Sequence, residues 1–504
     1  MSLKHGVYDL LVVGGGINGA GIAADAAGRG LSVILSEMND LASATSSNSS
    51  KLIHGGLRYL EYYEFRLVRE ALAEREILLK NAPHIIWPLR FRLPHRPHLR
   101  PALMIKAGLF LYDHLAKRVT LAGSKSIKFG NESPLKEVMK RGFEYSDGWV
   151  DDARLVILNA LAAQSKGAEI KTRCKCINAK RADGLWIVTL QDTFSGATET
   201  LQTRSIVNAA GPWVSSLFNE VMSTTPPKKI RLVKGSHIIV PRIHNEAEAY
   251  MLQNEDGRIV FVIPYEDKFS LIGTTDQEYY GDPAKVTIDQ GEIDYLINIT
   301  NQHFRTQISA ADIVRTYSGV RPLLDDEAGS AQAVTRDYSF EVDAPENQAP
   351  LISIFGGKIT TYRKLSEAAV DKLCEYFPTS GEKWTANAPL PGGNFSNQNS
   401  LQKEFTKQYG WLPTPLLRRF VRTYGTLTVD LLKNTTQLSD LGHQFAEGFY
   451  EAEILYLINN EWALTVEDII WRRTKLGLHM SDKEVDVLTQ YMENHFNQNI
   501  KAVS

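Results

Sequence analysis

Three glycines and a glutamate near the N-terminus have the spacing of a nucleotide-binding turn. Gly14, Gly16 and Gly19 form the pattern G-x-G-x-x-G between two apolar runs, and Glu37 follows 18 residues after Gly19. Such glycines allow a tight turn and a close approach of the backbone to a pyrophosphate, while the next helix presents N–H groups to the phosphates. An acid at this distance can bind a ribose hydroxyl. The pattern predicts a strand–helix–strand dinucleotide site and fits NAD and FAD alike.

A polar segment after the second apolar run favours FAD. Residues 43–61, SATSSNSSKLIHGGLRYLE, combine six hydroxyl side chains with a lysine, a histidine and two adjacent glycines. An ordinary NAD dehydrogenase needs no such loop, whereas the pyrophosphate and ribityl chain of a bound FAD pass through this region. Two glycines would also let the backbone lie flat against a ring. A solvated serine-rich loop is the alternative, but we expect cofactor contacts from Thr45, Ser46, Ser47, Ser50, Lys51, Gly55 and Gly56.

A third segment places positive charge beside a helix start. Residues 351–369, LISIFGGKITTYRKLSEAA, read as a buried strand, two glycines and a helix that begins near Thr360. N–H donors and a cation there would stabilise the negative charge of a reduced flavin. Thr360 would also serve as an ordinary helix cap. We expect cofactor contacts from Gly356, Gly357, Lys358 and Thr360.

The rest of the chain divides into a mixed middle region and a helical end. We expect an amphipathic helix over 61–81, a loop over the proline- and arginine-rich residues 88–101, and a helix over 102–118. Short apolar runs between 186 and 275 predict a largely antiparallel sheet. Prolines and glycines over 389–393 mark a linker, and 400–499 reads as almost wholly helical.

These segments together resemble the FAD-dependent oxidoreductases that include D-amino-acid oxidase and sarcosine oxidase, and within them the quinone-linked glycerol-3-phosphate dehydrogenases of bacteria. The motifs follow one another from about residue 8 to the C-terminal helices: SSKLIHGGLRYLE, RFRLPHRPHLRP, GFEYSDGWVDDARL, VNAAGPW, VKGSHIIVPR, SGVRPL, FGGKITTYRKL and EDIIWRRTKLGL. Gly211, in VNAAGPW, joins the expected cofactor contacts.

The resemblance implies an α/β fold with an additional helical domain. We expect a Rossmann-like FAD-binding domain, as in D-amino-acid oxidase and glutathione reductase, formed by residues 1–90, 145–230 and 320–388. Residues 91–144 and 231–319 would form a substrate domain with a mixed, largely antiparallel sheet. Residues 389–504 would form the C-terminal all-helical domain.

The resemblance also implies a reaction. It is the oxidation of sn-glycerol 3-phosphate to dihydroxyacetone phosphate, with FAD reduced and then reoxidised by ubiquinone. Oxidation of a secondary alcohol needs a base for the O–H proton and an acceptor for the hydride, here flavin N5. His237, in VKGSHIIVP, is the first candidate for the base, because imidazole titrates near neutral pH, and His54 is its rival. A soluble oxidase that uses oxygen and a flavin-bearing redox sensor are the alternatives.

The phosphate of such a substrate requires cations with directional donors. Arg321, in SGVRPL, is the leading candidate because a guanidinium can bind phosphate oxygens in pairs. We expect Arg58 and Lys358 to assist it, and Tyr59 to hydrogen-bond the substrate. The alternative for each arginine is a surface ion pair.

The composition bounds the partners. With 504 residues, a formal net charge of −2 and 43% hydrophobic residues, the chain gives no reason to expect nucleic acid. Its three cysteines suggest neither a metal site nor a disulfide framework, and no run of ~18 apolar residues exists to span a bilayer.

Residues 90–118 carry seven Lys and Arg against one acid, interleaved with apolar residues, which suits an anionic membrane surface as well as a buried core. The resemblance implies a peripheral place on the cytoplasmic face of the inner membrane. A monomer and a homodimer both stay open.

Overall fold

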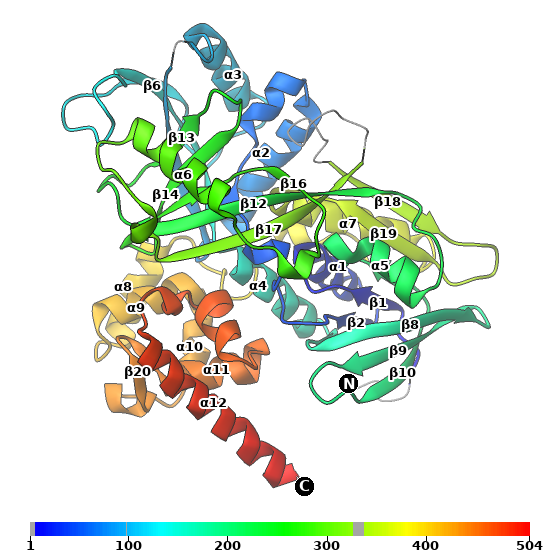
Figure 1. The fold of residues 1–504 in the computed structure, drawn as a ribbon. Coiled ribbons are helices and arrows are strands. Elements are labelled where there is room, and N and C mark those ends of the chain that lie inside the picture. Colours follow the sequence, from blue (N-terminus) through cyan, green and yellow to red (C-terminus); the bar gives the residue numbers. More distant parts are fainter. Residues whose placement is uncertain (1–5, 97, 326–336, 504) are drawn as a thin grey trace.

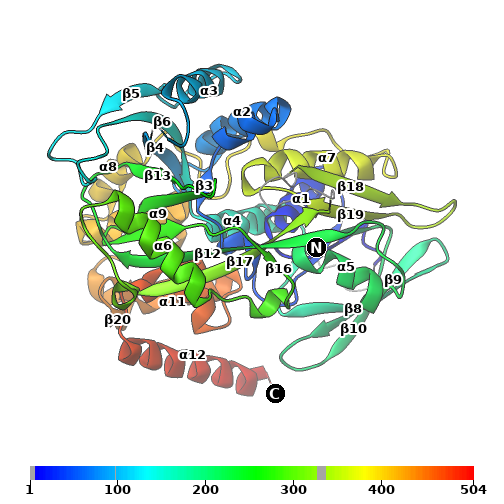
Figure 2. The same cartoon turned by 45° about the horizontal axis from the view of Figure 1, so that its top comes forward.

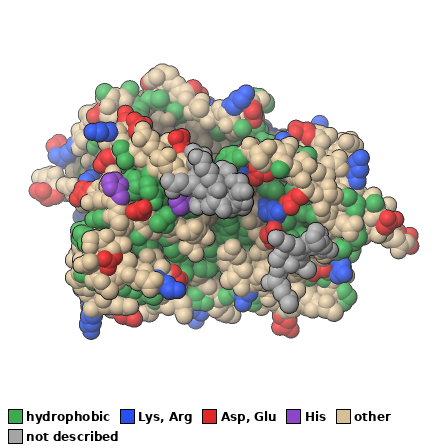
Figure 3. Space-filling model, turned by 90° about the horizontal axis from the view of Figure 1, so that it is seen from below, with side chains coloured by type: hydrophobic (Ala, Val, Ile, Leu, Met, Phe, Trp, Pro, Cys, Tyr) green, Lys and Arg blue, Asp and Glu red, His purple; other side chains and the backbone are tan. Residues whose placement is uncertain are grey.

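Two large sheets and a group of C-terminal helices make up the fold (Figure 1). The computed structural model describes residues 6–96, 98–325 and 337–503. Helix α3 lies at one end of the molecule and α12 at the other in both Figure 1 and Figure 2. On the face shown in Figure 3, side chains of both charges are intermixed with hydrophobic ones.

The first sheet is mainly parallel and carries the glycine turn. Its six strands are ordered β18-β19-β11-β1-β2-β7, and only the β18–β19 pair is antiparallel among the pairs described. The bounds are β1 (Leu10–Val13), β2 (Val33–Ser36), β7 (Glu169–Lys171), β11 (Ile206–Asn208), β18 (Tyr338–Asp343) and β19 (Leu351–Gly356). The predicted strand–helix–strand unit is therefore present.

Alternating side chains of β1 explain how this sheet is covered on both faces. Leu10 and Val12 pack into the cluster formed with the helices, whereas Leu11 and Val13 pack against a three-stranded sheet. Successive strand residues point to opposite faces, so a strand buried on both is apolar throughout. The helices are α1 (Ile17–Gly28), α4 (Asp152–Ser165) and α7 (Tyr362–Cys374); the three strands are β8 (Cys174–Ala182), β9 (Leu185–Asp192) and β10 (Thr198–Thr203).

The second large sheet has ten strands on its main path and its branches, and all but one of the described pairings are antiparallel. The main path runs β16 (Gln277–Tyr279), β12 (Ile230–Pro241), β15 (Phe269–Gly273), β14 (Ile259–Tyr265), β13 (Ala249–Gln253), β4 (Ile86–Pro94), β6 (Arg141–Val150) and β3 (Leu52–Ile53). Strand β17 (Arg315–Leu324) pairs with β12, and β5 (Lys125–Lys128) pairs with β6. Helix α6 (Gln290–His303) packs on one face, and α2 (Phe65–Asn81) and α3 (Ala102–His114) contribute to the apolar cluster on the other.

Two local predictions were wrong. Residues 86–94 form strand β4 rather than the start of a loop, because Leu89, Phe91 and Leu93 alternate into the apolar cluster. The intervening Arg90 and Arg92 both pair with Glu144 on β6. The helix expected over 61–81 begins only at Phe65, after the short 3₁₀ helix η2 (Leu57–Tyr62) and a left-handed residue, Tyr63.

The C-terminal region is helical, as predicted, apart from a short hairpin. The helices are α8 (Gln398–Gln408), α9 (Thr414–Tyr424), α10 (Thr428–Leu431), α11 (Glu451–Glu461) and α12 (Asp482–Val503); the hairpin is β20 (Gln444–Ala446) with β21 (Phe449–Tyr450). This region has its own apolar cluster, centred on buried residues such as Phe420, Phe449 and Leu457. Among the helices that the structure describes, none is long and apolar enough to cross a membrane.

Candidate active site

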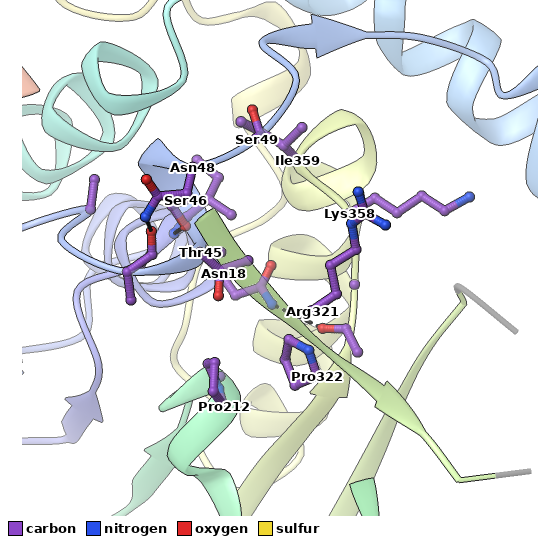
Figure 4. A pocket seen from close by; sticks show the side chains of 18 of the residues that line it. Asn18, Thr45, Ser46, Asn48, Ser49, Pro212, Arg321, Pro322, Lys358 and Ile359 are labelled. Atoms are coloured by element: carbon purple, nitrogen blue, oxygen red, sulfur yellow. Dashed lines mark hydrogen bonds between the residues drawn. The ribbon is translucent and has the colours of Figure 1, made fainter. Parts of the chain in front are cut away.

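A cavity of about 780 Å³ lies where the two large sheets meet. Pockets of roughly 300–1,000 Å³ are the usual size for small ligands and cofactors. The β1–α1 turn, the 42–50 loop, strands β12 and β17, and residues 356–360 all line it. In Figure 4, Ser46 and Asn48 lie on one side of the view and Arg321 and Lys358 on the other. The sequence segments that predict a cofactor site are thus brought together.

The glycine turn leaves backbone exposed where side chains would not fit. Gly14 has a φ of +112°, and a Cβ added there would lie 2.5 Å from the carbonyl oxygen of Ala209. A Cβ on Gly19 would lie 1.9 Å from the Gly14 oxygen, so helix and strand can meet only with glycine at both positions. Gly16 caps α1, and the Ile17 N–H donates to Ser46 Oγ at 3.0 Å. The geometry fits a pyrophosphate held by backbone at the helix start.

Glu37 stands at the end of β2, on the cavity wall. Its Oε2 accepts a hydrogen bond from Gly15 N at 2.6 Å, and its Oε1 accepts one from Asn39 N at 2.8 Å. Burial raises the pKa of this carboxyl, whereas the two N–H donors lower it. These donors fix the carboxylate at the position where a ribose would lie.

The serine-rich loop turns some of its predicted contacts toward the cavity and others away. Thr45, Ser46 and Ser50 line the cavity, and Thr45 Oγ1 donates to the Val320 oxygen at 2.7 Å. Lys51 is buried and its Nζ pairs with Asp152 Oδ1 at 2.9 Å. Its Nζ also donates to the Ser47 oxygen, and neither Ser47 nor Lys51 is on the cavity wall.

The His54–Tyr59 segment crosses the cavity wall. His54 lines it, and its N–H donates to Thr360 Oγ1 at 3.2 Å. Gly56 has a φ of +75° and also lines it, whereas Gly55 lies behind and donates its N–H to Tyr112 Oη at 2.7 Å. The other predicted glycines on the wall are Gly211, Gly356 and Gly357.

The predicted phosphate-binding cations line the same cavity. Arg321, on β17, forms an ion pair with Asp276 and keeps 31% of its side chain exposed. Arg58 donates to Tyr62 Oη at 3.3 Å, and Lys358 Nζ lies 3.8 Å from the centroid of the Tyr59 ring. Two arginines and a lysine facing one cavity can bind a dianion.

The two candidate bases are placed differently. His237, on β12, is 1% exposed and is not on the cavity wall. Its Nε2 lies 2.9 Å from Ser50 Oγ, and its ring stacks on Tyr317. Burial, with the charges of Lys51 and Arg321, lowers the pKa of His237 to about 3, so the ring is neutral at pH 7. His54 faces the cavity directly.

Several residues on the cavity wall are not predicted by the sequence. Asp276 belongs to no motif, and only the fold reveals that it pairs with Arg321. Asn18 donates from Nδ2 to the Gly356 oxygen at 3.3 Å, and its place inside the glycine pattern was the available signal. Asp147 also lies on the wall, within the motif GFEYSDGW, but nothing in the sequence assigned it a role. Within the described ranges, no group of three or more His, Cys, Asp or Glu side chains could hold a metal ion.

Comparison with known families covers nearly all of the chain. Residues 9–363 match the family of FAD dependent oxidoreductases. Residues 383–499 match the C-terminal domain of alpha-glycerophosphate oxidase. The junction between the two matches falls close to the predicted linker.

Similar proteins match nearly the whole length of the chain. The chain is 55% identical over 497 residues to the aerobic glycerol-3-phosphate dehydrogenase of Escherichia coli (strain K12), covering 98% of this chain and 99% of that one. It is 50% identical over 491 residues to the D-erythritol 1-phosphate dehydrogenase of Brucella abortus (strain 2308), covering 96% and 98%. The FAD complex of the glycerol-3-phosphate dehydrogenase from Bacillus halodurans has a similar structure, with a TM-score of 0.77, 27% identity, and coverage of 99% of this chain and 92% of that one. The chain therefore belongs to the FAD dependent oxidoreductase family, and its cofactor is FAD.

Proposed function

We propose that this chain oxidises sn-glycerol 3-phosphate to dihydroxyacetone phosphate and passes the electrons from FAD to ubiquinone. The observation that carries this proposal is one cavity in which the dinucleotide turn and the cations Arg58, Arg321 and Lys358 meet. The 55% identity to a dehydrogenase of this substrate supports it. The family supplies the cofactor, and the cations supply the reason for a phosphate ester rather than a plain alcohol.

The chain's own groups would hold the FAD and its substrate. The α1 start and Ser46 suit the pyrophosphate, Glu37 suits a ribose, and residues 356–360 suit the flavin ring. When bound, FAD supplies the hydride acceptor at N5. Arg321 would bind the phosphate with help from Arg58 and Lys358, which orients the carbon skeleton relative to the ring.

The proton of the substrate hydroxyl needs an acceptor on the cavity wall. Ser50 lines the cavity and contacts the neutral His237, so its hydroxyl can donate to Nε2 while its oxygen takes the substrate proton. His54 offers a direct route. Loss of flavin reduction in His237→Asn, with near-normal reduction in His54→Asn, would assign the first route.

A four-carbon substrate is the second candidate. The Brucella relative, at 50% identity, is a D-erythritol 1-phosphate dehydrogenase. Both substrates are polyol phosphates, so the same cations would serve either one. The two differ only in the length of the polyol beyond the phosphate.

The experiment is an anaerobic titration of the purified holoprotein. We expect sn-glycerol 3-phosphate to bleach the visible absorbance of the flavin and plain glycerol to leave it unchanged. Faster bleaching by D-erythritol 1-phosphate would make that compound the preferred substrate and would leave the proposed phosphate site unchanged. Peroxide formation in air that exceeds quinone reduction would favour the oxidase alternative.

Electron transfer to a quinone requires access to a bilayer, and α3 is the segment best suited to meet it. Its exposed apolar side chains are Leu103 (78%), Met104 (50%), Phe110 (61%) and Leu111 (42%). Lys106 and Lys117 are exposed within and just after the helix. An apolar face with basic residues suits the interface of an anionic membrane. We infer a peripheral attachment to the cytoplasmic face of the inner membrane through α3.

A further inference from the structure

A buried hydrogen-bond network joins α3 to the segment that carries Arg58 and Tyr59. Tyr112, on α3, is 2% exposed. Its hydroxyl donates to Asp147 at 2.8 Å and accepts the N–H of Gly55 at 2.7 Å. Arg75 pairs with the same carboxylate and donates to the Ser146 oxygen at 2.9 Å. The Gly55 N–H also donates to Asp147 directly, at the longer distance of 3.3 Å, so Tyr112 provides its shorter hydrogen bond and Arg75 neutralises the shared carboxylate.

The side chains of this network are almost fully buried, and Asp147 also borders the cavity. Arg75 and Asp147 are each 2% exposed, like Tyr112. A buried carboxylate needs a partner for its charge, and buried hydrogen bonds of this kind hold their members in one arrangement. The chain from Gly55 onward turns at Gly56 into η2, which presents Arg58 and Tyr59 to the cavity. The position of the Gly55 backbone therefore determines the backbone positions from which the Arg58 and Tyr59 side chains extend.

A second link connects the start of α3 to η2. Arg100, two residues before α3, pairs with Glu61 through both carboxylate oxygens, at 2.6 and 2.9 Å. Glu61 belongs to η2. Both ends of α3 are therefore tied to the segment that lines the substrate cavity: one by a buried bond to backbone, the other by a partly exposed ion pair.

We propose that Tyr112 is a positioning residue, which uses its hydroxyl to hold the Gly55–Tyr59 segment, and hence Arg58 and Tyr59, in the substrate-binding position. This proposal rests on the proposed function for the identity of the substrate but not for the anion site. Tyr112 itself is not on the cavity wall, so it acts only through the segment it holds.

The test is the Tyr112→Phe variant of the FAD-loaded enzyme. Phenylalanine keeps the ring and its packing and removes only the hydroxyl. We expect KM for sn-glycerol 3-phosphate to rise about tenfold, which corresponds to ~1.4 kcal/mol, with kcat of anaerobic flavin reduction within about twofold of wild type. The matched control is Tyr424→Phe, which removes another buried tyrosine hydroxyl, bonded to Glu453 at 2.6 Å in the C-terminal region. It should leave KM unchanged.

A second readout does not depend on turnover. Inorganic phosphate, titrated against the oxidised flavin spectrum, should bind about tenfold more weakly to Tyr112→Phe than to wild type. If wild type binds phosphate but no polyol phosphate reduces the flavin, the proposed substrate fails while the positioning role is still tested. Unchanged phosphate affinity and unchanged KM in Tyr112→Phe would overturn the positioning role.

The Arg100→Gln variant keeps the proposal falsifiable should Tyr112→Phe fold poorly. Its ion pair is partly exposed, so a rise in KM of only about twofold to threefold is expected. In the double variant the two effects should differ from the sum of the single ones, because both links hold the same segment. If Arg100→Gln leaves both KM and phosphate affinity unchanged, α3 does not position the segment.

Discussion

Charged side chains have different surroundings in the cavity and at the junction between the mainly parallel sheet region and the C-terminal helices. At the junction Arg154 and Glu461 form a pair with both side chains 0% exposed, and Arg473 pairs with Asp40 in the same way at 0% and 1%. In the cavity Arg321 also has a carboxylate partner, yet 31% of its side chain stays exposed. The junction cations are neutralised within the fold, whereas the cavity cation can still reach a ligand. Substitutions should therefore cost stability in one region and affinity in the other.

The largest effect is expected at the junction. Arg154→Met removes a cation and leaves the Glu461 carboxylate buried without its charge partner, which costs about 3–5 kcal/mol of unfolding free energy. The measurement is urea unfolding at pH 7 with the holoprotein. The double variant Arg154→Met with Glu461→Leu should recover most of the loss, since no buried charge is then left over.

The control for this prediction is an exposed pair. Arg66, 69% exposed, pairs with Asp337. Arg66→Met should cost less than about 1 kcal/mol. Equal losses from Arg66→Met and Arg154→Met would remove the distinction between buried and exposed pairs.

The cavity cation should affect binding instead. Arg321→Ala removes the fork expected to hold the phosphate and should raise KM for sn-glycerol 3-phosphate about a hundredfold, or ~2.7 kcal/mol. The unfolding midpoint and the FAD content should stay near wild type. Steady-state kinetics and the ratio of flavin to protein absorbance check both. A normal KM in this variant would take Arg321 out of the phosphate site.

The sequence predicts the glycine turn of this cavity but not the orientation of every side chain around it. The glycine turn was predictable because a G-x-G-x-x-G between two strands leaves few backbone solutions. The family, the fold class and the FAD cofactor are confirmed, whereas the individual site residues stay predictions. Ser47 and Lys51 illustrate the limit: the local sequence shows a polar loop, but not that Lys51 turns inward to pair with Asp152 and to donate to the Ser47 carbonyl oxygen.

Strand β4 shows a second limit. Prolines at positions 88 and 94 suggested a loop, but the apolar alternation between them decides the structure. The two arginines on the other face looked like a basic membrane patch in the sequence. In the fold they pair with Glu144, a partner some 50 residues away that no local pattern reveals.

One buried histidine at the junction and one behind the cavity make the stability of the fold depend on pH. His84 lies at the junction, close to Gly392 and Gly425, and His237 lies behind the cavity. Burial lowers the pKa of each to about 3. The unfolded chain binds these protons near pH 6.5, so the stability that each provides is complete above that pH and is lost as the pH falls from 6.5 toward 3. When the pH falls from 7.5 to 5.5, the free energy of unfolding should decrease by roughly 1.4 kcal/mol for each of these histidines.

The measurement is the pH dependence of the urea midpoint in wild type, His84→Gln and the exposed control His98→Gln. In His84→Gln the urea midpoint should depend less steeply on pH between 7.5 and 5.5 than in wild type, because glutamine takes up no proton on unfolding. The side chain of His98 is 55% exposed, so His98→Gln is the control for the substitution itself. A wild-type slope in His84→Gln would mean that this ring is already protonated in the folded protein.

The smallest effect is expected on the outer face of α3. The cations there are exposed to water, unlike the buried cations of the junction and the partly buried Arg321 of the cavity. Each lysine near an anionic bilayer contributes ~1 kcal/mol, so Lys106→Gln and Lys117→Gln should each weaken partition into phosphatidylglycerol vesicles about fivefold. Lys403→Gln, exposed on α8, is the control and should have no effect if α3 is the contact. Vesicle flotation at low and high salt gives the measurement, because salt screens exposed charges. Retention at high salt in both lysine variants would assign the attachment to Leu103 and Phe110, whose apolar contact does not depend on ionic strength in this way.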